Sequence, residues 1–169
     1  MTIHKIIYLP DPRLRKVSKK ITDFDDKLQT LIDDMFETMY YARGVGLAAP
    51  QIGLNIQLSV IDVIGDKSQQ YVLINPEITE AQGKEEYTEG CLSVPGVSDK
   101  VQRAKTVTMQ ALDRNGKPYE LTASGLLGEC IQHEIDHLNG KLYIDLLSPL
   151  KRNLARKKST KFIRQNENQ

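Results

Sequence analysis

The sequence predicts an α+β fold in which antiparallel β-sheets pack around a central helix, with further helices near the N-terminus and the C-terminus. Three observations predict it: an amphipathic pattern between residues 25 and 41, β-rich segments separated by turn residues between 57 and 122, and a second helical segment at 125–138. With 169 residues, 40% of them hydrophobic, the chain is long enough for one domain with its own core.

The first predicted helix follows an irregular segment that contains Pro10 and Pro12. Asp23 or Asp25 can cap this helix, which runs to about Tyr41. Its apolar residues recur at helical spacing, so that one face can be buried. They are Leu28, Leu31, Ile32, Met35, Phe36, Met39 and Tyr40.

Strands are expected at 57–64, 71–75, 101–112 and 119–122, which are β-rich runs bounded by turn residues. Asn115-Gly116 is a strong hairpin signal between the last two. The helix at 125–138 is expected to stop at Asn139-Gly140, which is a typical C-terminal cap. A third helix is expected to start at Ser148 and Pro149.

The composition excludes several classes of protein. Three His, two Cys and no Trp argue against a disulfide scaffold and against an array of structural zinc sites. No apolar run approaches the roughly 18 residues that a transmembrane helix needs. The N-terminus also lacks the apolar stretch and cleavage site of a signal peptide. These features predict a reduced, cytoplasmic protein.

The net charge of +1 hides an asymmetry. Residues 151–169 hold seven Lys and Arg against one acid, a net charge of +6, and the other 16 cations and 21 acids give residues 1–150 a net charge of −5. We therefore expect one domain over 1–150, with 151–169 as a basic helical tail of the same domain. The tail either attracts the phosphates of an RNA or is a solvated helix face. Neither DNA nor a membrane is an expected partner, and a monomer is expected.

The strongest chemical signal is His133-Glu134-Ile135-Asp136-His137, a His-Glu-x-x-His motif on the second helix. At about 100° per residue, the two histidines are about 40° apart on one helix face, which lets both imidazoles bind one metal ion. Glu134 lies at the edge of that face, where it can contact a metal-activated water without being a ligand. Leu126 and Cys130 share the histidine face and are expected to wall a pocket beside the metal.

A catalytic metal needs a third protein ligand. Downstream of His137 the sequence offers no His and only two acids, Asp145 and Glu167. Upstream, Cys91 lies in Glu89-Gly-Cys-Leu-Ser-Val-Pro-Gly96, a turn-rich segment in which the backbone can approach a ligand closely. Cys91 is therefore preferred over Cys130, whose path to the metal is blocked by the His133 ring.

A third segment, Gly44-Val-Gly-Leu-Ala-Ala-Pro-Gln51, partly matches a dinucleotide-binding fingerprint. That fingerprint must follow a strand and open a helix, whereas this segment follows a helix and leads to Pro50. We interpret it instead as a loop whose glycines let the backbone reach a ligand. Gln51 there offers an amide donor for a developing oxyanion.

Together the three segments, Gly44–Gln51, Glu89–Ser93 and His133–His137, resemble the motifs of the peptide deformylase family, in the same chain order and without a mismatch. The resemblance covers roughly residues 5–155 and is to the bacterial class I enzymes. It implies an enzyme that removes the formyl group from N-terminal formyl-methionine of nascent bacterial peptides. It also implies Fe²⁺ as the metal, replaceable by Zn²⁺, Ni²⁺ or Co²⁺, with Cys91, His133 and His137 as ligands.

The resemblance implies roles for further residues. Glu134 would act as general base and acid for a metal-activated water, and the Gln51 amide and the Leu92 N–H would stabilise the oxyanion. The Gly46 backbone would bind the peptide. The methionine side chain would fill a pocket walled by Gly44, Val45, Leu126, Cys130 and His133.

Three residues depart from the pattern of the family: Tyr87, Ser98 and Glu129. Glu129 is expected near the rim of the methionine pocket, where an acid would alter substrate preference. Two other functions compete with the deformylase reading. A zinc peptidase would need the downstream ligand that is missing, and a structural Cys-His-His site would need a fourth protein ligand.

Overall fold

The computed structural model describes residues 2–167. In this range the α-helices are α1 (Asp26–Tyr41), α2 (Gly125–Leu138) and α3 (Pro149–Glu167). The strands are β1 (Gly46–Ala48), β2 (Leu58–Ile61), β3 (Tyr71–Gln82), β4 (Glu85–Cys91), β5 (Val94–Arg103), β6 (Thr106–Leu112) and β7 (Pro118–Ser124). The mixed fold with antiparallel sheets confirms the predicted α+β class. None of the helices described is long and apolar enough to cross a membrane.

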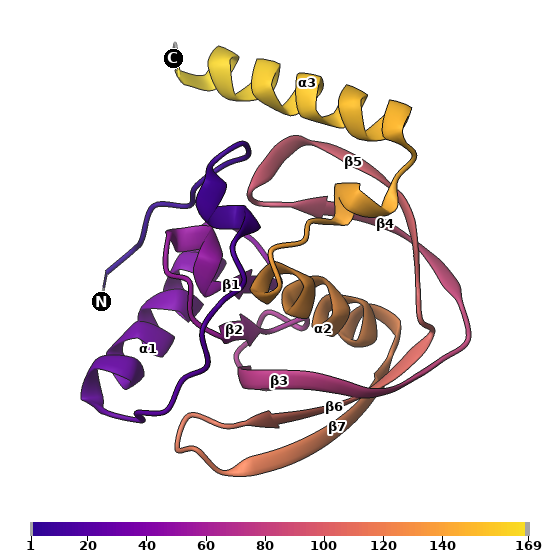
Figure 1. Ribbon diagram of the computed structural model, residues 1–169. Helices are drawn as coiled ribbons and strands as arrows, with labels where there is room; N and C mark the ends of the chain where they lie inside the picture. Colours follow the sequence, from indigo (N-terminus) through magenta and orange to yellow (C-terminus); the bar gives the residue numbers. More distant parts are fainter. Residues whose placement is uncertain (1, 168–169) are drawn as a thin grey trace.

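The strands form two antiparallel sheets. The larger has five strands in the order β1-β2-β3-β6-β7, and the smaller is the β4-β5 pair. Figure 1 shows α2 at the centre of the molecule, with β3, β6 and β7 below it and β4 and β5 above it. The helix is therefore enclosed by the two sheets, as predicted.

Helix α2 has two different buried faces. Ile131 and Ile135 pack with residues of the five-stranded sheet, among them Leu73 and Met109, in one hydrophobic cluster. The opposite face carries polar groups towards the β4-β5 pair, where Arg103 donates to Asp136 over 3.0 Å. An apolar face towards one sheet and a polar face towards the other fix the rotation of the helix about its axis.

Helix α1 begins where one of the two predicted caps lies. The Asp25 carboxylate accepts from the Leu28 N–H over 3.0 Å, so Asp25 and not Asp23 is the N-cap. Its predicted apolar face packs on β1 and β2, with Ile32, Met35 and Met39 fully buried. This packing holds the chain that leaves α1 against the centre of the fold.

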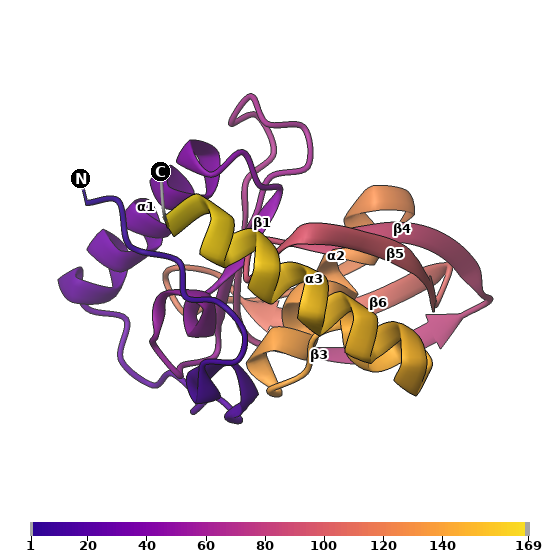
Figure 2. The same cartoon turned by 90° about the horizontal axis from the view of Figure 1, so that it is seen from above.

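Helix α3 lies across the outer side of β5, as the view from above makes clear (Figure 2). Few of its side chains are buried; Ala155 and Ser159 are the two in the described part of the helix. Ala155 joins Val94 and Val101 of β5 in a small cluster. The basic face of α3 is left in solvent, which agrees with the polar composition of residues 151–167.

The predicted strand at 101–112 is wrong as one element. The chain breaks at Ala104 and Lys105 between β5 and β6, and the Gln132 side chain of α2 satisfies both the N–H and the C=O of Ala104, each over 3.0 Å. The prediction also missed β4, whose sequence Glu-Glu-Tyr-Thr-Glu-Gly-Cys has low β-propensity. Pairing with β5 forms this strand, so the tertiary structure overrides the local preference.

Candidate metal centre

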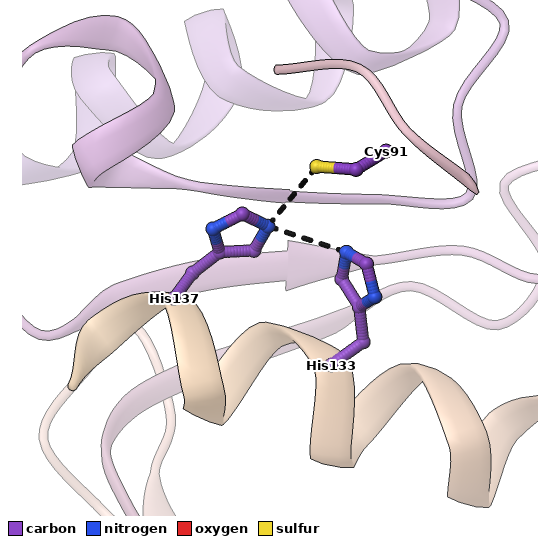
Figure 3. Close-up of side chains that lie close together, drawn as sticks. All are labelled: Cys91, His133 and His137. Carbon is purple, nitrogen blue, oxygen red and sulfur yellow. Dashed lines mark hydrogen bonds between the residues drawn. The ribbon is translucent and has the colours of Figure 1, made fainter. Parts of the chain in front are cut away.

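The three predicted ligands come together from two elements. His133 and His137 lie one turn apart on α2, and their Nε2 atoms are 3.2 Å apart. Cys91, at the end of β4, places its Sγ 3.3 Å from His137 Nε2 (Figure 3). One sulfur and two nitrogens thus lie within 4.8 Å of one another.

The donor set fits a metal ion. Ligand atoms bound tetrahedrally at about 2.0–2.3 Å from one ion are roughly 3.3–3.8 Å apart, close to the separations seen here. A thiolate and two imidazoles suit Zn²⁺ and Fe²⁺ better than Mg²⁺ or Ca²⁺, which prefer oxygen. Cys130 is not part of this group, because its Sγ faces the Val45 carbonyl at 3.9 Å.

A buried ion-pair network orients the first histidine. His133 Nδ1 lies 2.8 Å from a Glu89 carboxylate oxygen, so its Nε2 is left for the cluster. The Arg103 guanidinium donates to both Glu89 oxygens. Burial raises the pKa of Glu89, but the hydrogen bonds from Arg103 and His133 outweigh it and hold that pKa at about 2. Glu89 is therefore an anion that fixes the His133 ring.

Arg103 is a functional residue that the sequence did not single out. It is 7% exposed and pairs with Glu89 and Asp136 together. The only signal in the sequence is an arginine near the start of the strand predicted at 101–112, and such a position is common. The β4-β5 register pairs Arg103 with Glu85, so its contact with Glu89 becomes visible only in the folded structure.

Glu134 lies beside the cluster and is 2% exposed. One of its oxygens, Oε1, has no hydrogen-bond partner among the described residues. Burial raises the pKa of Glu134 to about 7. A carboxyl group in this state can accept and return a proton near neutral pH.

Gly46 lets the backbone of β1 pass close to this carboxylate. A methyl group at Gly46 would lie 2.8 Å from Glu134 Oε2 and 2.9 Å from Cys130 Sγ. Only glycine therefore fits between β1 and α2 at this point. This contact brings the predicted peptide-binding backbone next to the predicted base.

Gln51 is held with its amide towards the cluster. Its Oε1 accepts from the Ala48 N–H over 2.9 Å. Its Nε2 donates to Ser93 Oγ over 3.2 Å and points towards Cys91 Sγ at 3.6 Å. The N–H groups of the Gln51 amide therefore face the Cys91 sulfur and the Ser93 hydroxyl beside the cluster.

A cavity of about 620 Å³ opens beside these groups. Every site residue predicted from the sequence lines this cavity except His137, which is 1% exposed. The predicted residues that line it are Gly44, Val45, Gly46, Gln51, Cys91, Leu92, Leu126, Cys130, His133 and Glu134. Ile6 and Tyr8 also line it, and they come from the N-terminal segment to which the sequence assigned no role.

The three departures from the family pattern lie in different places. Glu129 lines the cavity and is 8% exposed, so it is buried in the wall instead of lying at the rim. Burial, and next the neighbouring Glu89 carboxylate, raise the pKa of Glu129 to about 7. Tyr87 and Ser98 are not among the described residues that line the cavity.

The chain is similar in sequence to known proteins over nearly its whole length. The family model described as polypeptide deformylase matches residues 3–153. The peptide deformylase of Azotobacter vinelandii is 54% identical over 166 residues, which cover 98% of this chain and 99% of that protein. That of Stutzerimonas stutzeri is 52% identical over the same shares.

Solved structures show the same fold. A peptide deformylase from Legionella pneumophila superimposes with a TM-score of 0.97 at 62% identity, covering 99% of each chain. One from Synechococcus elongatus, in complex with actinonin, has a TM-score of 0.89 at 45% identity and covers 93% of this chain and 88% of that one. The chain therefore belongs to the polypeptide deformylase family.

Proposed function

We propose that this chain hydrolyses the N-formyl group of formyl-methionine at the start of nascent bacterial polypeptides, releasing formate and a free amine. The observation that carries the proposal is the Cys91-His133-His137 cluster beside the buried Glu134, in a chain of the deformylase family. The structures of relatives from Synechococcus elongatus and Ehrlichia chaffeensis in complex with actinonin concern those proteins, and they support a comparable ligand site here.

Cys91, His133 and His137 are the residues that would hold the metal, with Fe²⁺ as the proposed ion and Zn²⁺, Ni²⁺ or Co²⁺ as replacements. When bound there, such an ion supplies Lewis acidity, which lowers the pKa of a water molecule and polarises a carbonyl group. Glu89 keeps the His133 ring in the ligand orientation through its 2.8 Å contact with Nδ1.

Glu134 is the proposed general base and acid. Its unpartnered oxygen accepts the proton of the attacking water, and the same carboxyl group then gives the proton to the leaving amine. Because the carboxyl group is buried, protonation and ionisation are close in free energy near neutral pH. The residue therefore returns to its starting state at the end of each turnover.

The chain also offers donors for the oxyanion that forms at the formyl oxygen. The Gln51 side-chain amide and the Leu92 backbone N–H are the proposed donors, and removal of one such donor costs about 3–4 kcal/mol of barrier. The Gly46 backbone would bind the peptide. Gly44, Val45, Leu126, Cys130 and His133 would enclose the methionine side chain, for which a flexible thioether is well suited.

Release of formate from formyl-Met-Ala-Ser tests the proposal, with protein prepared without oxygen and loaded with Fe²⁺. We expect formate and an equal amount of free Met-Ala-Ser, and no hydrolysis of the unformylated peptide. Cleavage of the unformylated peptide would indicate a zinc peptidase instead. Absence of formate from metal-loaded protein would contradict the proposal.

We also propose how the chain is placed in the cell. Residues 1–150 would form the catalytic part of a cytoplasmic monomer, with 151–169 as its basic tail.

The cations of α3 lie on a mostly solvent-facing helix, which suits attraction to ribosomal RNA phosphates. Co-sedimentation with ribosomes at low and high salt would compare the full chain with one that stops after Leu150. Equal retention of both forms would contradict the ribosome contact.

A further inference from the structure

Arg43 is a cation in the cavity wall that the proposed reaction does not use. It lies between α1 and β1, and its side chain is exposed. The acids that line the same cavity, Glu89, Glu129 and Glu134, are all buried. Within residues 2–167, no carboxylate lies at ion-pair distance from Arg43, whereas other arginines of the chain are paired. Its guanidinium is therefore available to an anion that enters the cavity.

The end of α1 fixes the point from which this side chain leaves the backbone. The Arg43 N–H donates to the Tyr40 carbonyl over 3.0 Å, and the Gly44 N–H donates to the Met39 carbonyl over 2.9 Å. Arg43 has a φ of 59°, which is the left-handed conformation that closes many helices and that glycine most often takes. The side chain thus starts from a defined turn beside the cavity.

The cavity wall is open to solvent on the Arg43 side of β1. Leu47 and Ala48, which follow Gly46, are fully buried, whereas Val45 is 40% exposed. A polypeptide whose methionine lies beside Gly46 therefore reaches solvent past Val45 and Arg43.

The distances along the two chains place Arg43 near the third residue of such a substrate. Extended backbone advances about 3.3 Å per residue, so Arg43 lies at most about 10 Å along the chain from Gly46. The third substrate residue lies about 7 Å from the methionine by the same measure. The long arginine side chain can span the difference.

We infer that Arg43 binds a carboxylate on the third residue of the formylated peptide, so that chains with Asp or Glu at this position are preferred substrates. A guanidinium presents a planar pair of N–H donors that matches a carboxylate. The inference rests on the proposed function, since it concerns the same cavity and substrate class. Arg43 acts on substrate binding, so its effect falls on KM and not on kcat.

The test uses formyl-Met-Ala-Xaa amides in which Xaa is glutamate, glutamine or lysine. The amide removes the C-terminal carboxylate, which would otherwise offer Arg43 an anion in every peptide. The readout is the ratio of kcat/KM for glutamate over glutamine, with kcat and KM measured separately. The unchanged protein should prefer glutamate to glutamine and glutamine to lysine, and high salt should weaken this preference because the pair is exposed.

We expect Arg43→Gln to lower the glutamate-to-glutamine ratio by about threefold, the size of an exposed ion pair, through a higher KM for the glutamate peptide. Arg43→Lys should keep part of the preference, because it keeps the charge but not the paired donors. Arg43→Glu should reverse the order of the glutamate and lysine peptides. Lys84→Gln is the matched control, because Lys84 is an exposed cation outside the cavity wall, and it should leave the ratio unchanged.

Two outcomes would overturn the inference. One is a glutamate-to-glutamine ratio that is the same in Arg43→Gln and in the unchanged protein. The other is an equal loss with all three peptides, which would mean that Arg43 only shapes the cavity wall. Failure of the proposed function is distinguishable from either, because the unchanged protein would then release no formate from formyl-Met-Ala-Ser.

Discussion

Three glutamates near the cluster show how the surroundings of a residue decide its chemistry. Glu89 has a pKa of about 2, because the hydrogen bonds from Arg103 and His133 outweigh its burial. Glu134 and Glu129 have pKa values raised to about 7, and burial is the largest cause for both. The same type of side chain is therefore held as an anion at Glu89, whereas at Glu134 and Glu129 it can be protonated near neutral pH.

Replacing Glu134 by Gln should separate metal binding from catalysis. The amide keeps the shape of the side chain but cannot take a proton, so turnover should fall by about 10²–10⁴-fold while metal content stays at one ion per chain. Formate release and metal analysis of the same preparation measure the two effects. If the variant kept most of its activity, the assignment of Glu134 as the general base would be contradicted.

The two cysteines should differ when each is changed to alanine. Cys91→Ala removes the sulfur that lies 3.3 Å from His137 Nε2, so the protein should lose its metal and its activity. Cys130→Ala serves as the comparison, since Cys130 lies outside the ligand group and the variant should keep most of its metal. Equal metal loss in both variants would contradict the assignment of Cys91.

At the scale of elements, the segment after β2 depends on one buried acid. Asp62 is 1% exposed and accepts from the Tyr40 hydroxyl and from the N–H groups of Gly65 and Lys67. Burial raises the pKa of Asp62, but these hydrogen bonds hold it below its usual range. The ionised side chain thus ties α1 to the turn that leads towards β3.

Asp62→Asn should lower the free energy of unfolding by about 1–3 kcal/mol at neutral pH. Because the folded-state pKa is lowered, the stabilisation is present above the unfolded pKa of about 3.9 and is lost as pH falls through the folded value. Urea unfolding at neutral and acid pH should therefore show a difference that shrinks in acid. Asp23→Asn, at an exposed site, is the control. A difference that grows in acid would contradict this account.

At the scale of the whole molecule, the cluster joins parts of the chain that are far apart. Cys91 belongs to the β4-β5 pair, and both histidines belong to the central helix, which packs on the five-stranded sheet. A metal ion held by these groups would therefore connect both sheets through α2. Its binding should stabilise the fold as well as permit catalysis.

Removal of the metal with a chelator should abolish formate release and lower the melting temperature. A metal present at about 100 times its Kd contributes about 2.7 kcal/mol, which corresponds to about 5–10 °C for a chain of this size. Calorimetry before and after chelation, and after addition of Fe²⁺, measures the shift. Cys91→Ala provides the control, because it should melt at the same temperature with and without chelator.

The elements that could be predicted are those with a local cause. Helix α2 was expected at 125–138 and is found at Gly125–Leu138, because its apolar period and the Asn139-Gly140 cap lie in adjacent residues. The strand β4 and the break at Ala104 could not be predicted. Their causes are pairing with β5 and the Gln132 side chain, both supplied by distant parts of the chain.

The same division applies to the site. The spacing of His133 and His137 follows from the sequence alone, because 3.6 residues per turn place both on one helix face. Tertiary packing brings Cys91 Sγ to 3.3 Å from His137 Nε2, while Cys130 faces the Val45 carbonyl. The same packing brings Arg103 to Glu89 and buries Glu129 in the cavity wall. The physical reason is that helical spacing is set by local backbone geometry, whereas these contacts depend on how the β4-β5 pair packs against α2.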